Sequence, residues 1–247
     1  MTPSLPALYD AVEHTWPPAR RITAGPWMLR VGLGGGKRVS AATAVADVSV
    51  SDLAQAEIGM VELGQSPLFM VREGEGELDE ILADAGYAIV DPVTLYTLPI
   101  GRLTDVPLPR VTAFCIWDPL AIMREIWAEG GIGPARLDVM ARAQTKTAIL
   151  ARWKEKPAGT AFVAVHDGVA MVHAVEVLPH QRRMGVAQWI MRAAALWAAQ
   201  HGAKQIAVLC VTENLPANAL YQSLGFSPAG RYHYRNKPQG EDKPNGS

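Results

Sequence analysis

The stretch "VEVLPHQRRMGVAQWIM", residues 175–191, constrains the fold of this chain more than any other feature. It begins with the apolar alternation of a strand and ends with apolar residues at helical spacing, with two arginines and Gly185 at the join. A strand that enters a helix this way points the free amides of the first helical turn at whatever lies in front. The stretch therefore predicts a mixed α and β fold with an anion site, although solvated arginines beside a permissive glycine are the alternative.

Composition limits the class of protein. Of 247 residues, 49% are hydrophobic and 19% charged, which is enough apolar material for a packed core and fits two small domains. The net charge of -1 predicts no general attraction to nucleic acid or to an anionic membrane. No window approaches 18 uninterrupted apolar residues, and the N-terminus lacks a signal-peptide pattern, so we expect a soluble cytoplasmic protein. Cys115 and Cys210 lie in apolar runs and are expected to be buried thiols.

Residues 1–105 are predicted to form a small α+β domain. Proline, glycine and capping residues divide it into short elements. We expect a helix at 9–16, strands at 27–31 and 38–45 joined by the glycine-rich turn 32–37, a helix from 51 capped by Ser51 or Asp52, a strand at 67–73, a helix at 77–86, and an extended segment at 87–100 that Pro92 interrupts.

The prolines between residues 98 and 109 indicate a linker, so a second domain is expected at 106–236, followed by a flexible tail at 237–247. Asp118 is expected to cap a helix that ends at Gly130. The remaining elements expected are a helix at 133–143, an antiparallel meander at 146–153, 159–167 and 169–178, a long helix at 185–202, a strand at 204–211, a short helix at 216–225 and a last strand at 231–235.

Two blocks in this second domain resemble a known family. "VLPHQRRMGVA" is similar to the acetyl-coenzyme A motif of the GNAT N-acetyltransferase superfamily, in which Gln or Arg is followed by two residues, Gly, one residue, and Gly or Ala. Arg182, Gly185 and Ala187 fill that motif. "ENLPANALYQSLGF" resembles the later motif of the family, which is filled here by Asn214, Pro216, Ala217, Leu220, Tyr221, Leu224, Gly225 and Phe226. The resemblance covers about residues 111–235, and residues 1–100 look like a degenerate GNAT half without the diphosphate loop.

The resemblance implies where coenzyme A would bind. The strand that ends at Val177 would splay from the strand at 204–211, and the pantetheine arm would pair with the exposed main chain of Val177. The amides from Arg183 to Ala187 would hold the diphosphate at the helix start. The cofactor-binding residues implied are Val177, Arg182, Arg183, Met184, Gly185, Val186, Ala187 and Asn214. For Asn214, simple helix capping is the alternative.

The resemblance also implies catalytic roles. Tyr221 matches the position whose phenol donates a proton to the thiolate leaving group, with packing in the core as the alternative. Glu176 is the candidate base, although strand alternation puts Val175 and Val177 on one face and Glu176 on the other. His173 is a weaker candidate, expected on the face opposite Glu176 and more typical of a structural histidine.

Other features carry less information. The turn at 32–37 matches no phosphate-loop spacing, and strands flank it on both sides. Trp27, Arg30 and Arg38 could line a substrate pocket between the two halves, but a core tryptophan is the commoner case. The spacing of His14, His166, His180 and His201 suggests no metal site.

The sequence therefore predicts an α+β GNAT fold and an N-acetyltransferase that uses acetyl-coenzyme A without a metal. The acceptor is expected to be a primary amine of a small molecule or peptide, and the protein a monomer or homodimer. A catalytically weak sensor that binds acyl-coenzyme A is the alternative, and turnover with a panel of amines would separate the two.

Overall fold

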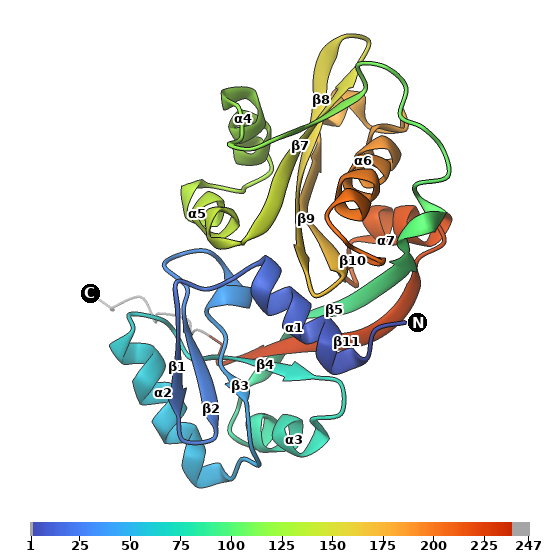
Figure 1. The fold of residues 1–247 in the computed structure, drawn as a ribbon. Helices are drawn as coiled ribbons and strands as arrows, with labels where there is room; N and C mark the ends of the chain where they lie inside the picture. Colours follow the sequence, from blue (N-terminus) through green and yellow to red (C-terminus); the bar gives the residue numbers. More distant parts are fainter. Residues whose placement is uncertain (1, 239–247) are drawn as a thin grey trace, which may run out of the picture.

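The computed structural model describes residues 2–238, so the expected tail lies outside it from residue 239 onward. The described chain is a mixed α and β structure with one sheet of eight strands and one of three, which confirms the predicted fold class (Figure 1). Within this part of the chain, every helix is too short or too polar to cross a membrane.

The N-terminal half contributes a three-stranded sheet and two strands of the larger sheet. Its helices and strands are α1 (Leu5–Thr15), β1 (Arg20–Ala24), β2 (Trp27–Val31), β3 (Thr43–Ala44), α2 (Leu53–Glu62), β4 (Leu68–Arg72), α3 (Gly76–Asp84) and β5 (Ala88–Pro99). Strand β1 was not predicted, and it pairs with β2 across the turn at Gly25. β5 is one strand, and Pro92 appears only as a register shift against its neighbour.

Two predictions for this half differ from the structure in detail. The strand expected at 38–45 shrinks to β3, because a 3-10 turn occupies Lys37–Val39. Asp52, one of the two caps expected, takes the N-cap position of α2 but makes no side-chain capping bond there, and the capping bonds form one turn earlier, around the 3-10 turn Val50–Asp52. Ser49 and Asp52 form a reciprocal capping box, in which the Asp52 carboxylate accepts from the Ser49 amide at 2.8 Å.

The C-terminal half follows the expected order closely. Its elements are β6 (Ala113–Ile116), α4 (Ala121–Glu129), α5 (Pro134–Arg142), β7 (Thr145–Trp153), β8 (Lys156–His166), β9 (Val169–Val177), α6 (Val186–Gln200), β10 (Gln205–Val211), α7 (Leu215–Ser223) and β11 (Ser227–Asn236). Edge strand β6 was not predicted. Asp118 does not cap α4, because Leu120 takes the N-cap position, whereas Gly130 ends this helix as expected.

The larger sheet joins the two halves by an exchange of strands. Its order is β4-β11-β5-β10-β9-β8-β7-β6. The last strand of the first half, β5, lies between β10 and β11 of the second, and β11 lies between β4 and β5. Figure 1 shows β5 and β11 side by side across the middle of the molecule. The boundary expected at 105/106 falls between Arg102 and β6, and the division into two domains stays a prediction because one sheet spans both.

Helices cover both faces of this sheet. Helix α6 packs on one face against apolar residues of β7, β8 and β9, including Ile149, Val163 and Val172. On the opposite face, α4 and α5 pack against Leu150 and Phe162. The site between β9 and β10 therefore has a protected side under α6 and a separate side toward α4, α5 and the N-terminal half.

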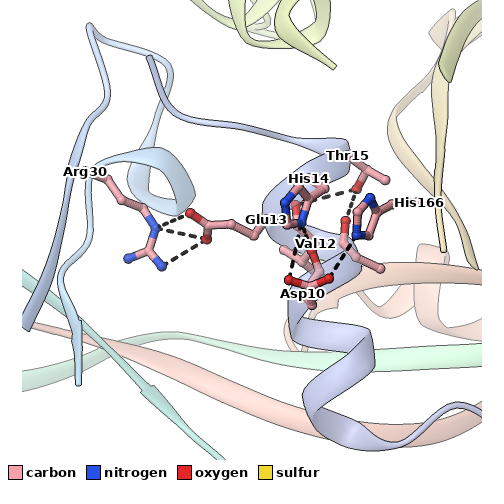
Figure 2. Close-up of polar contacts among 8 residues, drawn as sticks. Asp10, Val12, Glu13, His14, Thr15, Arg30 and His166 are labelled. Atoms are coloured by element: carbon pink, nitrogen blue, oxygen red, sulfur yellow. Dashed lines mark hydrogen bonds and ion pairs between the residues drawn. The ribbon is translucent and has the colours of Figure 1, made fainter. Parts of the chain in front are cut away.

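Helix α1 ties the small sheet to the large one (Figure 2). Glu13 accepts from the buried guanidinium of Arg30 in β2, at 2.9–3.0 Å. One turn earlier, Asp10 accepts from His166 at the end of β8, at 2.9 Å. Arg30 is thus paired with Glu13 and lines a pocket of about 450 Å³ at this junction, whereas Trp27 is fully buried in the core of the N-terminal half.

Candidate active site

Strands β9 and β10 separate partway along their length, as expected. They pair in parallel only from Val169 opposite Gln205 to Val172 opposite Val208. Beyond that point β9 continues to Val177 beside β8, while β10 continues beside β5. The unpaired ends leave a gap with exposed main-chain groups. An extended ligand can form hydrogen bonds with these groups, as an added strand does.

A bulge at Ala174 marks the start of this gap. Ala174 has a φ of 52°, and the β8 register shifts between Phe162 opposite His173 and Thr160 opposite Glu176. The indole of Trp127 in α4 donates to the Ala174 carbonyl at 2.8 Å, which holds the bulge.

The bulge changes which side chains share a face. Because it inserts one residue, His173 and Glu176 both lie on the α4 face, and the expectation that they face opposite sides was wrong. Val175 and Val177 pack on the α6 face, as predicted. Simple alternation cannot detect an inserted residue, so this arrangement was not visible in the sequence.

The main chain of Val177 points into the gap. The amide of the next residue, Leu178, donates to the Ala158 carbonyl of the neighbouring strand β8 at 2.9 Å. Since alternate residues of an antiparallel pair face the partner strand, the amide and carbonyl of Val177 point away from β8. The Val177 carbonyl accepts from Arg182 Nε at 3.1 Å, so this arginine lies at the end of the gap.

The start of α6 has the form of an anion cradle. Gly185 is its N-cap with a φ of 77°, and it makes no side-chain capping bond, so the first amides of the helix are left to other acceptors. A Cβ at this position would have no neighbour closer than 4.0 Å, so the space in front is open. Arg182, Arg183 and Met184 are exposed around the turn, Ala187 is half-buried, and Val186 is buried with only its backbone available.

Tyr221 lies on α7 beside the other side of the gap. Its ring is almost fully buried near Tyr96 and Phe226. Burial, with Cys210 and Glu176 nearby, raises the pKa of its phenol, so the hydroxyl remains protonated at neutral pH. Within residues 2–238 this hydroxyl has no hydrogen-bond partner, which leaves its proton for a ligand. Both the predicted donor role and core packing fit this position.

Glu176 reaches from β9 toward the end of α4. Gly130 makes room for it, since a Cβ there would lie 2.5 Å from Glu176 Cδ. Burial raises the pKa of the Glu176 carboxyl, and Arg182 opposes this in part. A half-buried carboxyl with a raised pKa is suited to accept a proton near neutral pH.

Asn214 and Asn218 organise the first turn of α7. Asn214 Oδ1 accepts from the Ala217 amide at 3.2 Å, which is the capping role weighed as its alternative, and coenzyme contact by this residue stays a prediction. The amide nitrogen of Asn218 donates to the carbonyls of Val211, Thr212 and Asn214, and its Oδ1 accepts from Tyr96 at 2.9 Å. Sequence reasoning missed Asn218, because its partners are main-chain groups.

Three other residues seen in the sequence come together away from this gap. Asp10, His14 and His166 have potential ligand atoms within 4.8 Å of one another, although their sequence spacing gave no such signal (Figure 2). The two imidazoles stack with centroids 3.9 Å apart and planes 6° apart. Both imidazoles contact the Asp10 carboxylate, at 3.3 and 2.9 Å, so the cluster joins α1 to β8.

The two cysteines differ in exposure. Both are free, as expected, and Cys210 is buried in β10. Cys115 is exposed on edge strand β6, so its expected burial was wrong. An apolar run on an edge strand still leaves one side to solvent.

Comparisons with known proteins agree on the family. A family model described as "Acetyltransferase (GNAT) family" matches residues 118–226, which include the gap, the α6 cradle and Tyr221. "Uncharacterized N-acetyltransferase YobR" of Bacillus subtilis (strain 168) is 28% identical over 90% of this chain and 94% of its own length. Residues 118–226 therefore form a GNAT acetyltransferase domain, and the similarity to an N-acetyltransferase over most of the chain agrees with this.

The GNAT fold extends over the whole chain. A GCN5-related N-acetyltransferase from Kribbella flavida matches with a TM-score of 0.73 and 19% identity, covering 97% of this chain and 98% of that one. An aminoglycoside N(6')-acetyltransferase type 1 of Acinetobacter haemolyticus is 33% identical over only 28% of this chain and 48% of its own. The N-terminal half is thus shared with GNAT proteins of similar length, and the second match covers a small part of the chain.

Proposed function

We propose that this protein is an N-acetyltransferase that moves the acetyl group of acetyl-coenzyme A to a primary amine by direct attack. The observation that carries the proposal is the gap between β9 and β10, which lies beside the open start of α6. Arg182, Arg183, Met184, Gly185, Val186 and Ala187 would surround the diphosphate, and the main chain of Val177 would pair with the pantetheine arm. Asn214, at the start of α7, would approach the same arm.

The reaction removes two protons from the ammonium group of the acceptor: one passes through Glu176 to solvent, and the other replaces the proton that Tyr221 gives to sulfur. Glu176, directly or through water, takes a proton from the ammonium form of the acceptor, and the neutral nitrogen attacks the thioester carbonyl. The C–N bond forms and the C–S bond breaks, with the electron pair leaving on sulfur. Tyr221 protonates that thiolate and regains a proton from the attacking nitrogen. The products are the N-acetyl amide and coenzyme A with a free thiol.

The test is thiol release from acetyl-coenzyme A with a broad panel of amines, together with calorimetry of coenzyme binding. Turnover with at least one amine, and acetylated product by mass spectrometry, are the expected results. Binding without turnover across the panel would support the alternative, a sensor of acyl-coenzyme A. The proposal requires no metal and includes the cytoplasmic location and the monomeric or homodimeric state expected from the sequence.

A further inference from the structure

A second cleft opens at the bulge, on the sheet face opposite α6. It has a volume of about 390 Å³ and is lined by Ala174 of β9, Val211 of β10 and Tyr234 of β11, among others. Its remaining walls come from the glycine-rich loop of the N-terminal half and from residues at the start of α5. Because this cleft reaches the splayed strands from the side away from α6, it is where an acceptor amine would enter if the proposed function holds.

The charge of this cleft is positive and only partly neutralised. Three basic side chains line it, those of Lys37, Arg38 and Arg136, against one carboxylate, Asp91. Asp91 is already paired with Lys37. Within residues 2–238 neither arginine forms an ion pair with a carboxylate, so two guanidinium charges remain for a ligand.

The structure holds Arg38 in place without cancelling its charge. Its Nη1 donates to His173 Nδ1 at 3.1 Å, its guanidinium lies over the ring of Trp16, and its Nε is buried without a partner in the described chain. The Thr15 hydroxyl donates to the Ala11 carbonyl at 2.6 Å, so its oxygen must accept from His173 Nε2 at 3.0 Å. That bond places the ring proton on Nε2 and the lone pair of Nδ1 toward the arginine.

His173 is therefore a neutral support. It is buried, and burial together with Arg38 lowers its pKa well below the usual value, so it adds no charge and is not suited to act as the base. A carboxylate in its place would have neutralised Arg38. A neutral imidazole fixes the direction of the guanidinium and leaves its charge for another group.

Arg136 reaches the same cleft from α5. Its guanidinium lies against the loop, with Nε 3.5 Å from where a Cβ would stand at Gly36, whose φ is 99°. The neighbouring Gly35 packs on Val139 so closely that a Cβ would lie 2.5 Å from it. The absence of side chains at Gly35 and Gly36 thus lets the loop pack closely on α5 beside Arg136.

We propose that the acceptor is a primary amine that also carries a carboxylate, which Arg38 and Arg136 bind while the amine points through the bulge toward the thioester. This inference rests on the proposed function and adds the acceptor class to it. The aromatic rings of Trp16, Tyr232 and Tyr234 supply apolar walls for the carbon skeleton. The cleft volume suits a molecule of amino-acid to short-peptide size.

The experiment compares each amino acid in a panel with its carboxamide, which keeps the amine and removes the charge. We expect kcat/KM to be about 30-fold or more higher for the acids, mainly through KM, since a charge-assisted pair to arginine is lost in the amides. Arg136→Gln should reduce this preference about tenfold, mainly by raising KM for the acids, with coenzyme affinity unchanged. Arg38→Gln should act in the same direction, and Arg124→Gln on the outside of α4 serves as the control.

The outcomes separate this inference from the proposed function. Equal or faster acetylation of the carboxamides by the wild-type protein would overturn the acceptor class while leaving the acetyltransferase intact. An undiminished preference in the well-folded Arg136→Gln protein would overturn the role of this cleft. If the protein acetylated none of the amino acids, carboxamides or other amines tested, the proposed function and the inference would both be overturned.

Discussion

The two halves of the molecule contain the same series of elements, but they differ at the start of the first helix in the series and in one buried residue of the second. In the first, β3, α2, β4, α3 and β5 follow one another, and in the second β9, α6, β10, α7 and β11 do so. The helix starts differ most. Helix α2 is preceded by a capping box in which the Asp52 carboxylate accepts from the Ser49 amide, whereas α6 begins at Gly185 with two arginines nearby. A carboxylate in that place repels an anion that the other helix start attracts.

The second helix of each series, α3 in the first half and α7 in the second, shows the same kind of contrast. "ILADAGY", residues 81–87, follows the pattern of "LYQSLGF", residues 220–226, with a glycine of positive φ near each helix end. Leu82 stands where the second half has Tyr221, and it is fully buried. The fold thus needs the helix, the glycine turn and the following aromatic residue, while the phenol is an addition specific to the second half.

The substitution with the largest expected effect blocks the open start of α6. Gly185→Glu should weaken coenzyme binding by about 100-fold or more, because it adds a negative charge and bulk where the diphosphate would approach. Gly202→Glu is the matched control, since Gly202 has a φ of 85°, open surroundings and a place at the far end of α6. Calorimetry that finds equal affinity for both variants would refute the cradle.

The substitution Tyr221→Phe tests whether the phenol of the second half takes part in catalysis. We expect kcat to fall by about 100-fold while coenzyme affinity changes less than twofold, because a proton donor to the leaving group acts in the transition state. Tyr96→Phe, a neighbouring phenol that bonds to Asn218, should change kcat only a few-fold. If the two variants turned over alike, Tyr221 would be a core residue like Leu82.

The strand exchange can be weakened at Asp79 of α3, which accepts from Arg235 and His233 of β11 at 2.6 and 2.7 Å. Asp79→Asn should lower the free energy of unfolding by about 2 kcal/mol, because it leaves the buried Arg235 without its carboxylate. The measurement is urea unfolding, with exposed Asp84→Asn on the same helix as control.

The pH dependence of this pair has a definite sign. Hydrogen bonding from Arg235 lowers the Asp79 pKa, so its contribution is present above the unfolded pKa, about 4, and is lost as pH falls through the folded pKa. The difference between wild type and Asp79→Asn should therefore shrink below about pH 4. A difference that persisted undiminished at lower pH would show that the effect of the substitution on stability does not come from the charge of Asp79.

The smallest expected effect concerns Glu176. We assign no matching role to any residue of the first half. Because burial raises the pKa of Glu176, the acid limb of kcat/KM against pH should lie above that of an ordinary glutamate, about 4.3. Glu176→Gln should remove this limb and lower kcat/KM by roughly tenfold, whereas the exposed Glu129→Gln should not. The same acid limb in both variants would assign the base elsewhere.

The predictability of each half follows from how locally its structure is determined. The meander, α6, β10 and α7 were predicted because hydrophobic period and glycine position define them within short windows. Strand β1 was missed although its hairpin with β2 is local, whereas the expected strand at 38–45 was too long because the loop before β3 packs on α5, far along the chain. Strand β5 was placed correctly, but nothing local indicates that its neighbours are β10 and β11.

The candidate site divides in the same way. The predicted residues Val177, Arg182 and Gly185 lie together at one end of the gap, because one continuous stretch of chain carries them. The bulge at Ala174 and the His173 support of Arg38 were not predictable, since each depends on contacts between distant segments. Asn218 likewise needs the end of β10 and Tyr96 to be in place before its role appears.

The exchange of β5 and β11 also affects how the protein is made. During synthesis β5 is complete long before either of its sheet neighbours, which lie within the last 43 residues of the sequence, 205–247. One edge of β5 must therefore wait for residues 205–211, and its other edge and one edge of β4 for residues 227–236, so the first hundred residues cannot finish folding as they emerge. Such late, distant pairing favours slow folding and makes a chaperone that shields strand edges useful.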